Sequence, residues 1–306
     1  MTPFMEQTAR YEAVRWVASQ GANSANPNDG VGPGGERGET NPQGNNALYS
    51  VGSEAARTLH AATGGVIPSL LCPSDSNSTQ PGRNFGARTN IMVSYGDAMN
   101  NNAFASAEAG THSRCGRRGV FAVRTWNDFG TIADGTSNTI AAAEGLTGDL
   151  RAGASPNVKG GIQWFSTYGT PLECATTSRS AGDPNTLVNP LVEFRGHWHT
   201  HGQVRVTGFS TVLRPNDVNC APQNAIGSWG MMAAQSNHTG GVNVLFMDGS
   251  VSFVSETIDN GNLMMPGTTN HVPHNNMPGN LDDFGASPFG VWGAIGTKSG
   301  GESVRL

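Results

Sequence analysis

The stretch SNHTGGVNVLFMDGSVSFVS, residues 236–255, carries the clearest structural signal in the chain, because strand, turn and strand patterns follow one another there without a break. Asp248-Gly249 is a dipeptide that favours a two-residue turn, since both residue types accept positive φ angles. Alternating apolar residues flank this dipeptide on both sides. We therefore expect a β-hairpin in which Asp248 and Gly249 have a structural role as the turn.

A two-residue turn also sets the pairing of the two expected strands. Counting outward from the turn, Phe246 faces Val251 and Val244 faces Phe253. Side chains alternate between the two faces of a strand, so both pairs would share one face. We expect this face to be buried, with Phe246 and Phe253 in the core.

The same hairpin resembles the C-terminal signature of a large family, domain of unknown function 1559, which is prepilin-like and expanded in planctomycete bacteria. The matching run extends from His238 through Gly240-Gly241 and Asp248-Gly249 to Phe253. Further stretches are similar to that family in the same order: Leu71-Cys72-Pro73-Ser74-Asp75, Asp134 to Ile140 with Glu144, Gly208 to Leu213 with Pro215-Asn216 and Cys220, and Trp292 to Thr297 with Gly300-Gly301-Glu302. The resemblance spans nearly the whole chain.

This resemblance implies an α+β fold in which a pilin-like N-terminal helix packs on an antiparallel β-sheet with long, Gly/Asn-rich, disulfide-stapled loops. Members of the family usually begin with a basic prepilin leader and a long apolar helix, and this sequence begins after the point where that helix would end. Thr2-Pro3 can start a short amphipathic helix that ends at Gly21. We expect one pilin-like domain over residues 1–306, divided into the end of the N-terminal helix (1–21), a loop-rich sheet region (22–235), and a C-terminal hairpin and tail (236–306).

The sequence also predicts individual elements within this domain. The sequence predicts strands at Asn90–Tyr95, Ile162–Tyr168 and Gln203–Leu213, and a turn followed by a buried apolar strand within Gly135–Glu144. Near the C-terminus, Trp292 and Ile295 are the expected anchors that dock the tail.

Composition excludes several functional classes. Charged residues make up only 13% of the chain, and 42 Gly and 17 Pro leave many positions unsuited to a helix. A net charge of −5 without a basic run argues against nucleic acid as a partner, because its phosphates are recognised by clustered Lys and Arg. No apolar run reaches the roughly 18 residues of a membrane span. We therefore expect neither nucleic-acid binding nor a membrane span.

Four cysteines lie far apart in the sequence, at positions Cys72, Cys115, Cys174 and Cys220. This spacing fits neither a zinc ribbon nor a redox Cys-x-x-Cys pair. We expect all four to form disulfides, in one of three pairings that the sequence leaves open. Nearest-neighbour pairs would each contribute about 4 kcal/mol in the loop-entropy model. The alternative is four buried thiols in a cytosolic protein.

Three histidines, His197, His199 and His201, occupy alternate positions. On a strand they would share one face, where neutral imidazoles can bind zinc or copper. No carboxylate or cysteine lies at a fixed spacing beside them, so an exposed polar face is the favoured interpretation and no metal is expected.

A second pattern, Asp134, Thr136 and Asn138, has the alternate spacing of a calcium loop. The remainder of the twelve-residue calcium-binding pattern, including its final Glu, is absent. Hydrogen bonds from these side chains to the backbone of a turn are therefore the favoured interpretation.

No Gly-x-Ser-x-Gly elbow, His-Glu-x-x-His helix or P-loop occurs in the chain, so we expect no catalytic residue and no cofactor. The favoured function is a structural, pilin- or pseudopilin-like subunit outside a bacterial cell, which assembles into a homo-oligomer or filament. The alternative is an extracellular carbohydrate- or solute-binding module, in which Trp164, Trp198 and Trp229 would stack on a glycan. A third hypothesis is a metal-dependent enzyme that uses the His197 cluster.

Overall fold

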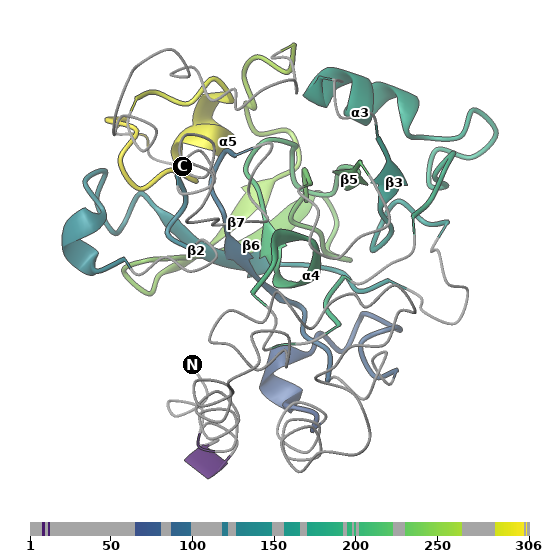
Figure 1. Cartoon of the computed structure of the whole chain (residues 1–306), viewed down its shortest axis with the longest axis horizontal. Coiled ribbons are helices and arrows are strands. Elements are labelled where there is room, and N and C mark those ends of the chain that lie inside the picture. The colour runs from purple at the N-terminus through teal and green to yellow at the C-terminus, as the bar shows by residue number, and fades with distance from the viewer. Residues whose placement is uncertain are drawn as a thin grey trace, which may run out of the picture.

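The computed structural model describes residues 8, 9, 12, 65–80, 87–98, 118–121, 127–148, 156–165, 170–191, 195–197, 199, 202–222, 230–264, 285–302 and 304 (Figure 1). In chain order the elements are the 3₁₀ helix η4 (Pro68–Leu70), β1 (Ile91–Ser94), the 3₁₀ helix η7 (Phe129–Thr131), β2 (Ile140–Glu144), β3 (Gln163–Trp164), α3 (Pro171–Thr177), α4 (Val204–Thr207), β4 (Gly208–Phe209), β5 (Cys220–Ala221), β6 (Gly241–Phe246), β7 (Val251–Ser255) and α5 (Gly290–Ala294). The fold is thus mixed α+β, with few and short helices.

The main sheet has five strands in the order β4-β1-β2-β6-β7. Three neighbouring pairs, β1 with β2, β2 with β6 and β6 with β7, are antiparallel, and β4 lies parallel to β1 at one edge. Strands β3 and β5 form a separate two-stranded parallel sheet. The expected antiparallel sheet is therefore present, with one short parallel strand added to it.

Strands β6 and β7 form the predicted hairpin, but their register differs from the prediction by one residue. Leu245 pairs with Val251, and Asn243 pairs with Phe253. A slip of one residue moves the side chains of one strand to the opposite face relative to its partner. Phe246 is buried as predicted, whereas Val251 and Phe253 are 64% and 51% exposed. The prediction that Phe253 lies in the core was wrong.

The turn geometry explains the shifted register. Four residues, 247–250, lie between the two strands, and the N–H of Phe246 donates to the oxygen of Ser250 (2.9 Å), which closes a loop of three residues instead of two. Within this loop the N–H of Gly249 donates to the oxygen of Phe246 (3.0 Å). Gly249 has a φ of 88°, while Asp248 has no positive φ, so the turn is not the two-residue type. The Asp248 carboxylate accepts from the hydroxyl and the N–H of Ser250. These two bonds hold the pKa of Asp248 below its usual value.

One other predicted element was correct only in part, because β4 covers just Gly208–Phe209 of the strand predicted over 203–213. The run 203–213 reads as a strand, but it begins with the helical turn α4, in which the N–H groups of Val206 and Thr207 donate to the oxygen of Gln203. All four residues of α4 are buried. The alternation of valines with other residues therefore does not mark one buried and one exposed face. Strands β1 and β2 are confirmed, and β3 covers only part of its predicted range.

The buried face of the main sheet packs against the C-terminal part of the chain. Trp292 in α5 and Ile295 just after it are 0% and 1% exposed. The Trp292 ring stacks near Phe209, with 6.2 Å between ring centroids, and its Nε1 donates to the oxygen of Leu213 (2.8 Å). Figure 1 shows α5 beside the sheet and close to the C-terminus. The predicted anchoring of the tail by these two residues is confirmed.

Only three residues of the predicted N-terminal helix lie in the described part of the chain. Thr8, Ala9 and Glu12 are helical and exposed. The packing of this helix on the sheet stays a prediction. None of the described helices has both the length and the apolar character that crossing a membrane requires.

Candidate functional site

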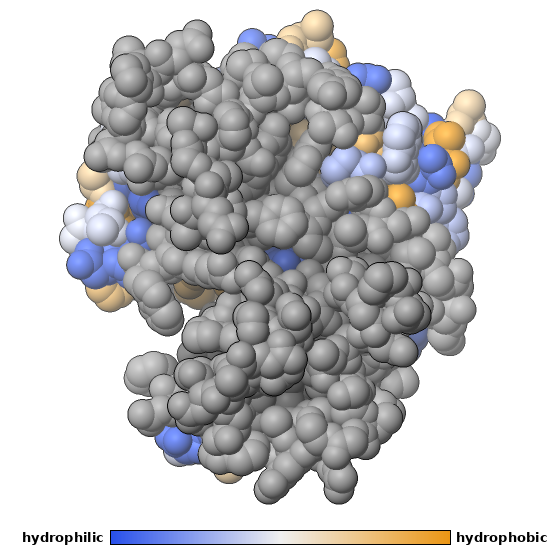
Figure 2. Space-filling view, in the orientation of Figure 1, coloured by the Kyte–Doolittle hydropathy of each residue, from blue (hydrophilic) through white to orange (hydrophobic). Residues whose placement is uncertain are grey.

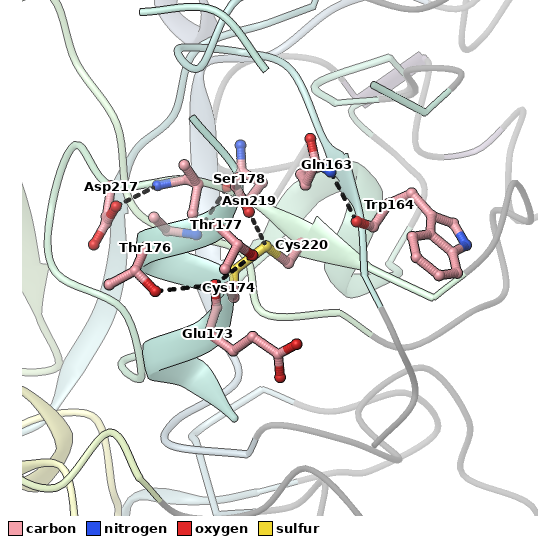
Figure 3. Close-up of a disulfide and its surroundings, with 12 residues drawn as sticks. Gln163, Trp164, Glu173, Cys174, Thr176, Thr177, Ser178, Asp217, Asn219 and Cys220 are labelled. Carbon is pink, nitrogen blue, oxygen red and sulfur yellow. Dashed lines mark hydrogen bonds between the residues drawn. A yellow bond between two sulfur atoms is a disulfide. The ribbon is translucent and has the colours of Figure 1, made fainter. Parts of the chain in front are cut away.

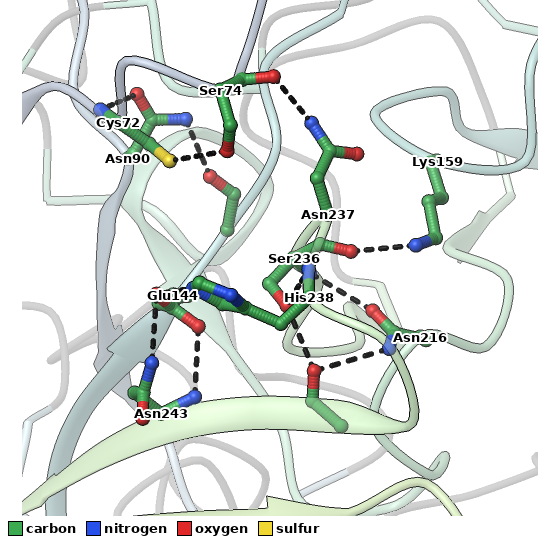
Figure 4. A network of polar contacts seen from close by, with 12 residues as sticks. Cys72, Ser74, Asn90, Glu144, Lys159, Asn216, Ser236, Asn237, His238 and Asn243 are labelled. Atoms are coloured by element: carbon green, nitrogen blue, oxygen red, sulfur yellow. Dashed lines mark hydrogen bonds and ion pairs between the residues drawn. The ribbon is translucent and has the colours of Figure 1, made fainter.

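Segments far apart in the sequence meet at one end of the main sheet (Figure 4). They are the loop around Ser74, the end of β2 at Glu144, and the residues just before β6. The Asn237 side chain donates to the oxygen of Ser74 (2.7 Å), and Nε2 of His238 lies 3.1 Å from Oε1 of Glu144. The structure thus brings together residues that carry the family resemblance.

Glu144 is the centre of this cluster. Its Oε2 accepts from the N–H of Asn243 (2.8 Å), and its Oε1 accepts from the Asn243 side chain (3.2 Å) as well as lying beside His238. The Glu144 side chain is 23% exposed and that of His238 is 49% exposed. The carboxylate therefore fixes the position of an imidazole that water can reach.

Asp75 follows Ser74 in the chain and is 5% exposed. Its carboxylate accepts from the Asn90 side chain (2.7 Å), from the N–H and hydroxyl of Thr147 (2.9 Å each) and from the N–H of Asn77 (3.0 Å). A buried carboxylate with this many donors holds three segments in fixed positions. Asp75 is therefore structural support for the surface loop that contains Ser74.

The cysteines behave differently from one another. Cys174 in α3 and Cys220 in β5 are fully buried and form a disulfide, which is one of the two nearest-neighbour pairs (Figure 3). Cys72 is a free thiol whose sulfur lies 3.0 Å from the hydroxyl of Ser74. Since Cys174 and Cys220 are bonded to each other, Cys115 is the only other cysteine in the chain with which Cys72 could pair, and the expected oxidation of Cys72 stays a prediction. Cys115 lies outside the described residues.

The opposite, solvent-facing side of the hairpin carries a group of apolar side chains. The observed register places Leu245, Val251 and Phe253 on this side, with exposed fractions of 38%, 64% and 51%. The Phe253 ring lies over Gly241, where a Cβ would come within 2.9 Å of two ring atoms. We call these three residues the hairpin face. Its position next to Asn243 and Glu144 makes it continuous with the polar cluster.

The hairpin face ends at an edge strand, because β7 is the last strand in the order of the main sheet. The oxygen of Ser250 accepts from the N–H of Phe246, and the N–H of Glu256 donates to the oxygen of Gly240, just before β6. By alternation, the backbone groups of Ser252 and Val254 also point toward β6. The N–H and C=O groups of Val251 and Phe253 consequently point away from the sheet. Within the described residues these groups have no partner.

The Asp134 pattern serves to hold backbone segments together. The Asp134 carboxylate accepts from the N–H groups of Gly300 (2.6 Å) and Gly301 (2.8 Å), and the Asn138 side chain donates to the oxygen of Asp134 (2.9 Å). The oxygen of Thr136 accepts from the N–H of Asp248 in the hairpin turn. These contacts agree with the turn interpretation and leave the carboxylate engaged by protein donors.

The histidine run does not form the expected exposed strand. His197 is fully buried, and neither His197 nor His199 lies in a strand, because His199 belongs to a turn. His199 is partly buried, and His201 lies outside the described residues. Within the part of the chain that the structure describes, no three His, Cys, Asp or Glu side chains are grouped so that they could hold a metal ion.

Of the tryptophans expected to bind a glycan, the structure describes Trp164, which is 46% exposed on β3. Trp198 and Trp229 lie outside the described residues.

The fold and the site together define a mixed α+β protein whose sheet carries an exposed apolar hairpin beside a polar cluster. The chain belongs to the family described as protein of unknown function (DUF1559), whose model matches residues 1–261. No curated protein and no solved structure matches the chain. The family predicted from the sequence is therefore confirmed, and its description assigns no activity.

Sequence reasoning missed two features of the site. The contact of Glu144 with His238 and Asn243 requires the pairing of β2 with β6, which joins residues about 100 positions apart and leaves no local pattern. The hairpin face was missed because it depends on the register. Ser250 is the signal in the sequence that could have revealed it, because its hydroxyl bonds to Asp248 and so favours the longer turn.

Proposed function

We propose that this protein is a non-enzymatic structural subunit, pilin- or pseudopilin-like, which assembles with copies of itself on the outside of a bacterial cell. The observation that carries the proposal is the edge strand β7, with outward backbone groups and two exposed apolar side chains, Val251 and Phe253. An open strand edge is a template for pairing with another strand.

The sequence of the hairpin supports a second copy as the partner. Soluble proteins protect open edges with Lys, Pro or a bulge, yet β6 and β7 contain neither a charged residue nor a proline. Two β7 strands from two copies can pair antiparallel around a two-fold axis, which brings the two hairpin faces side by side. Such a contact is closed, so growth into a filament requires a second contact on another surface.

The composition around the hairpin face also suits an interface. Protein interfaces commonly have an apolar centre surrounded by polar groups. Glu144, His238 and Asn243 provide such polar groups at one side, and their hydrogen bonds to one another are already formed before association. Burial of this side of the cluster would therefore leave its carboxylate satisfied.

The proposed location outside the cell is supported by the disulfide. Bonds such as Cys174–Cys220 persist in oxidising compartments and are rare in the cytosol. The free Cys72 is only partly exposed, which is compatible with either compartment.

Size-exclusion chromatography with light scattering tests the proposal. Val251→Lys places a charge on the edge strand and should abolish the pairing of β7 with β7, so that the two-fold contact is lost, because a Lys on an edge strand opposes its pairing with another strand. Val188→Lys is a matched control, since Val188 is 60% exposed but lies away from β7. A monomeric wild-type protein, or a Val251→Lys variant that assembles like the wild type, would contradict the proposal.

A further inference from the structure

Trp164 is exposed in a part of the fold that is otherwise well buried. Trp164 is 46% exposed, whereas its chain neighbours, Gln163 on β3 and Phe165 just after it, are 6% and 4% exposed. Figure 3 shows the indole pointing away from the disulfide and its surroundings. Trp164 is therefore a single outward-pointing side chain on a strand that is otherwise buried.

The backbone of Trp164 is held from both sides. On one side, its N–H donates to the oxygen of Asn189 (2.8 Å). On the other side, the N–H of Gln163 donates to the oxygen of Asn219 (2.7 Å), and that of Phe165 donates to the oxygen of Ala221 in β5 (2.9 Å). The Gln163 side chain adds a brace, because its Oε1 accepts from the N–H of Asn189 (2.9 Å) and its Nε2 donates to the oxygen of Trp164 (3.0 Å). The buried disulfide ties β5 to α3. A ligand would meet a side chain whose backbone is already fixed, which lowers the entropy lost on binding.

The described segment that pairs with β3 opposite Trp164 carries no charge. Gln163 forms an antiparallel bridge with Pro190, so Asn189 lies opposite Trp164 on the same face. Asn189 is exposed, and its side-chain amide has no partner within the described residues. The surrounding segment 185–191 contains no charged residue, and Val188 within it is exposed. Figure 2 shows hydrophobic and hydrophilic residues interspersed at the surface around α3 and β3.

We infer that Trp164 is a stacking platform for a neutral carbohydrate ring, with Asn189 as a hydrogen-bonding partner for its hydroxyl groups. A pyranose ring has an apolar C–H face that matches an indole and a rim of hydroxyls that matches an amide. A charged ligand finds no counter-ion on this segment. A protein partner would require a wider apolar area than one indole and one valine provide. This site lies on the small β3–β5 sheet, so it is separate from the hairpin face of the main sheet.

Isothermal titration calorimetry with cellohexaose, chitohexaose and laminarihexaose tests this inference. At least one of these neutral oligosaccharides should bind. Trp164→Ala should weaken its affinity about tenfold or more, and Trp164→Phe should retain part of it. Asn189→Ala should weaken it about threefold, through the loss of one hydrogen bond.

Two controls keep this outcome distinct from folding and assembly. Leu172→Ala on α3 removes another exposed apolar side chain and should leave binding unchanged. Val251→Lys should bind like the wild type, since it changes only the hairpin face. Absence of binding by all three oligosaccharides, or equal affinity in Trp164→Ala, would overturn the inference.

Discussion

At the scale of single residues, carboxylates join segments that are distant in the sequence. Asp75 accepts from both donor groups of Thr147, and Asp134 accepts from the backbone of Gly300 and Gly301. In a chain with few and short helices, these side-chain bonds hold the loops together where regular secondary structure is absent. Because such carboxylates are buried, removing one leaves several donors without a partner.

Asp75→Ala should therefore lower the free energy of unfolding by about 3 kcal/mol, since it leaves buried donors of Asn90 and Thr147 unsatisfied. Asp183→Ala is the matched control. Asp183 accepts similar bonds from Asn185 and Thr186, but it is fully exposed, and water can replace it. Urea unfolding followed by tryptophan fluorescence measures both variants. Equal stability of the two would contradict the structural role of Asp75.

At the scale of elements, the sequence was sufficient to predict the hairpin, the strands β1 and β2, and the buried side of β6. It was not sufficient for the register of β7. The sequence Met-Asp-Gly-Ser at 247–250 is compatible with a two-residue or a three-residue turn. The bonds from the N–H and hydroxyl of Ser250 to the Asp248 carboxylate favour the longer turn. Similarly, α4 is fully buried, so its pattern of valines does not distinguish a strand from a helical turn.

The observed register predicts different effects for two phenylalanines of the hairpin. Phe246→Ala should cost about 3–5 kcal/mol, because Phe246 is only 5% exposed. Phe253→Ala should cost about 1 kcal/mol, because half of Phe253 remains in contact with water. Both values come from denaturant unfolding at concentrations where the protein is dissociated. Similar large losses in both variants would instead support the two-residue turn and its register.

At the scale of the whole molecule, the resemblance predicted which motifs matter and the structure shows which of them meet. The loop around Ser74, Glu144 and His238 come together because β2 pairs with β6, a long-range contact that local patterns do not encode. The single domain, the packing of the N-terminal helix and the location of the protein stay predictions. The disulfide Cys174–Cys220 is confirmed as one pair, although the sequence permitted three pairings.

Self-assembly through the β7 edge is tested most directly by hydrogen exchange of individual backbone amides. The amides of Val251 and Phe253 point outward, so they should exchange slowly in the assembled protein and rapidly after dilution to monomers. Ser252 and Val254 are internal controls, since their amides point toward β6 and should be protected in both states. Rapid exchange of Val251 and Phe253 in a protein that remains assembled would show that its copies associate through another surface.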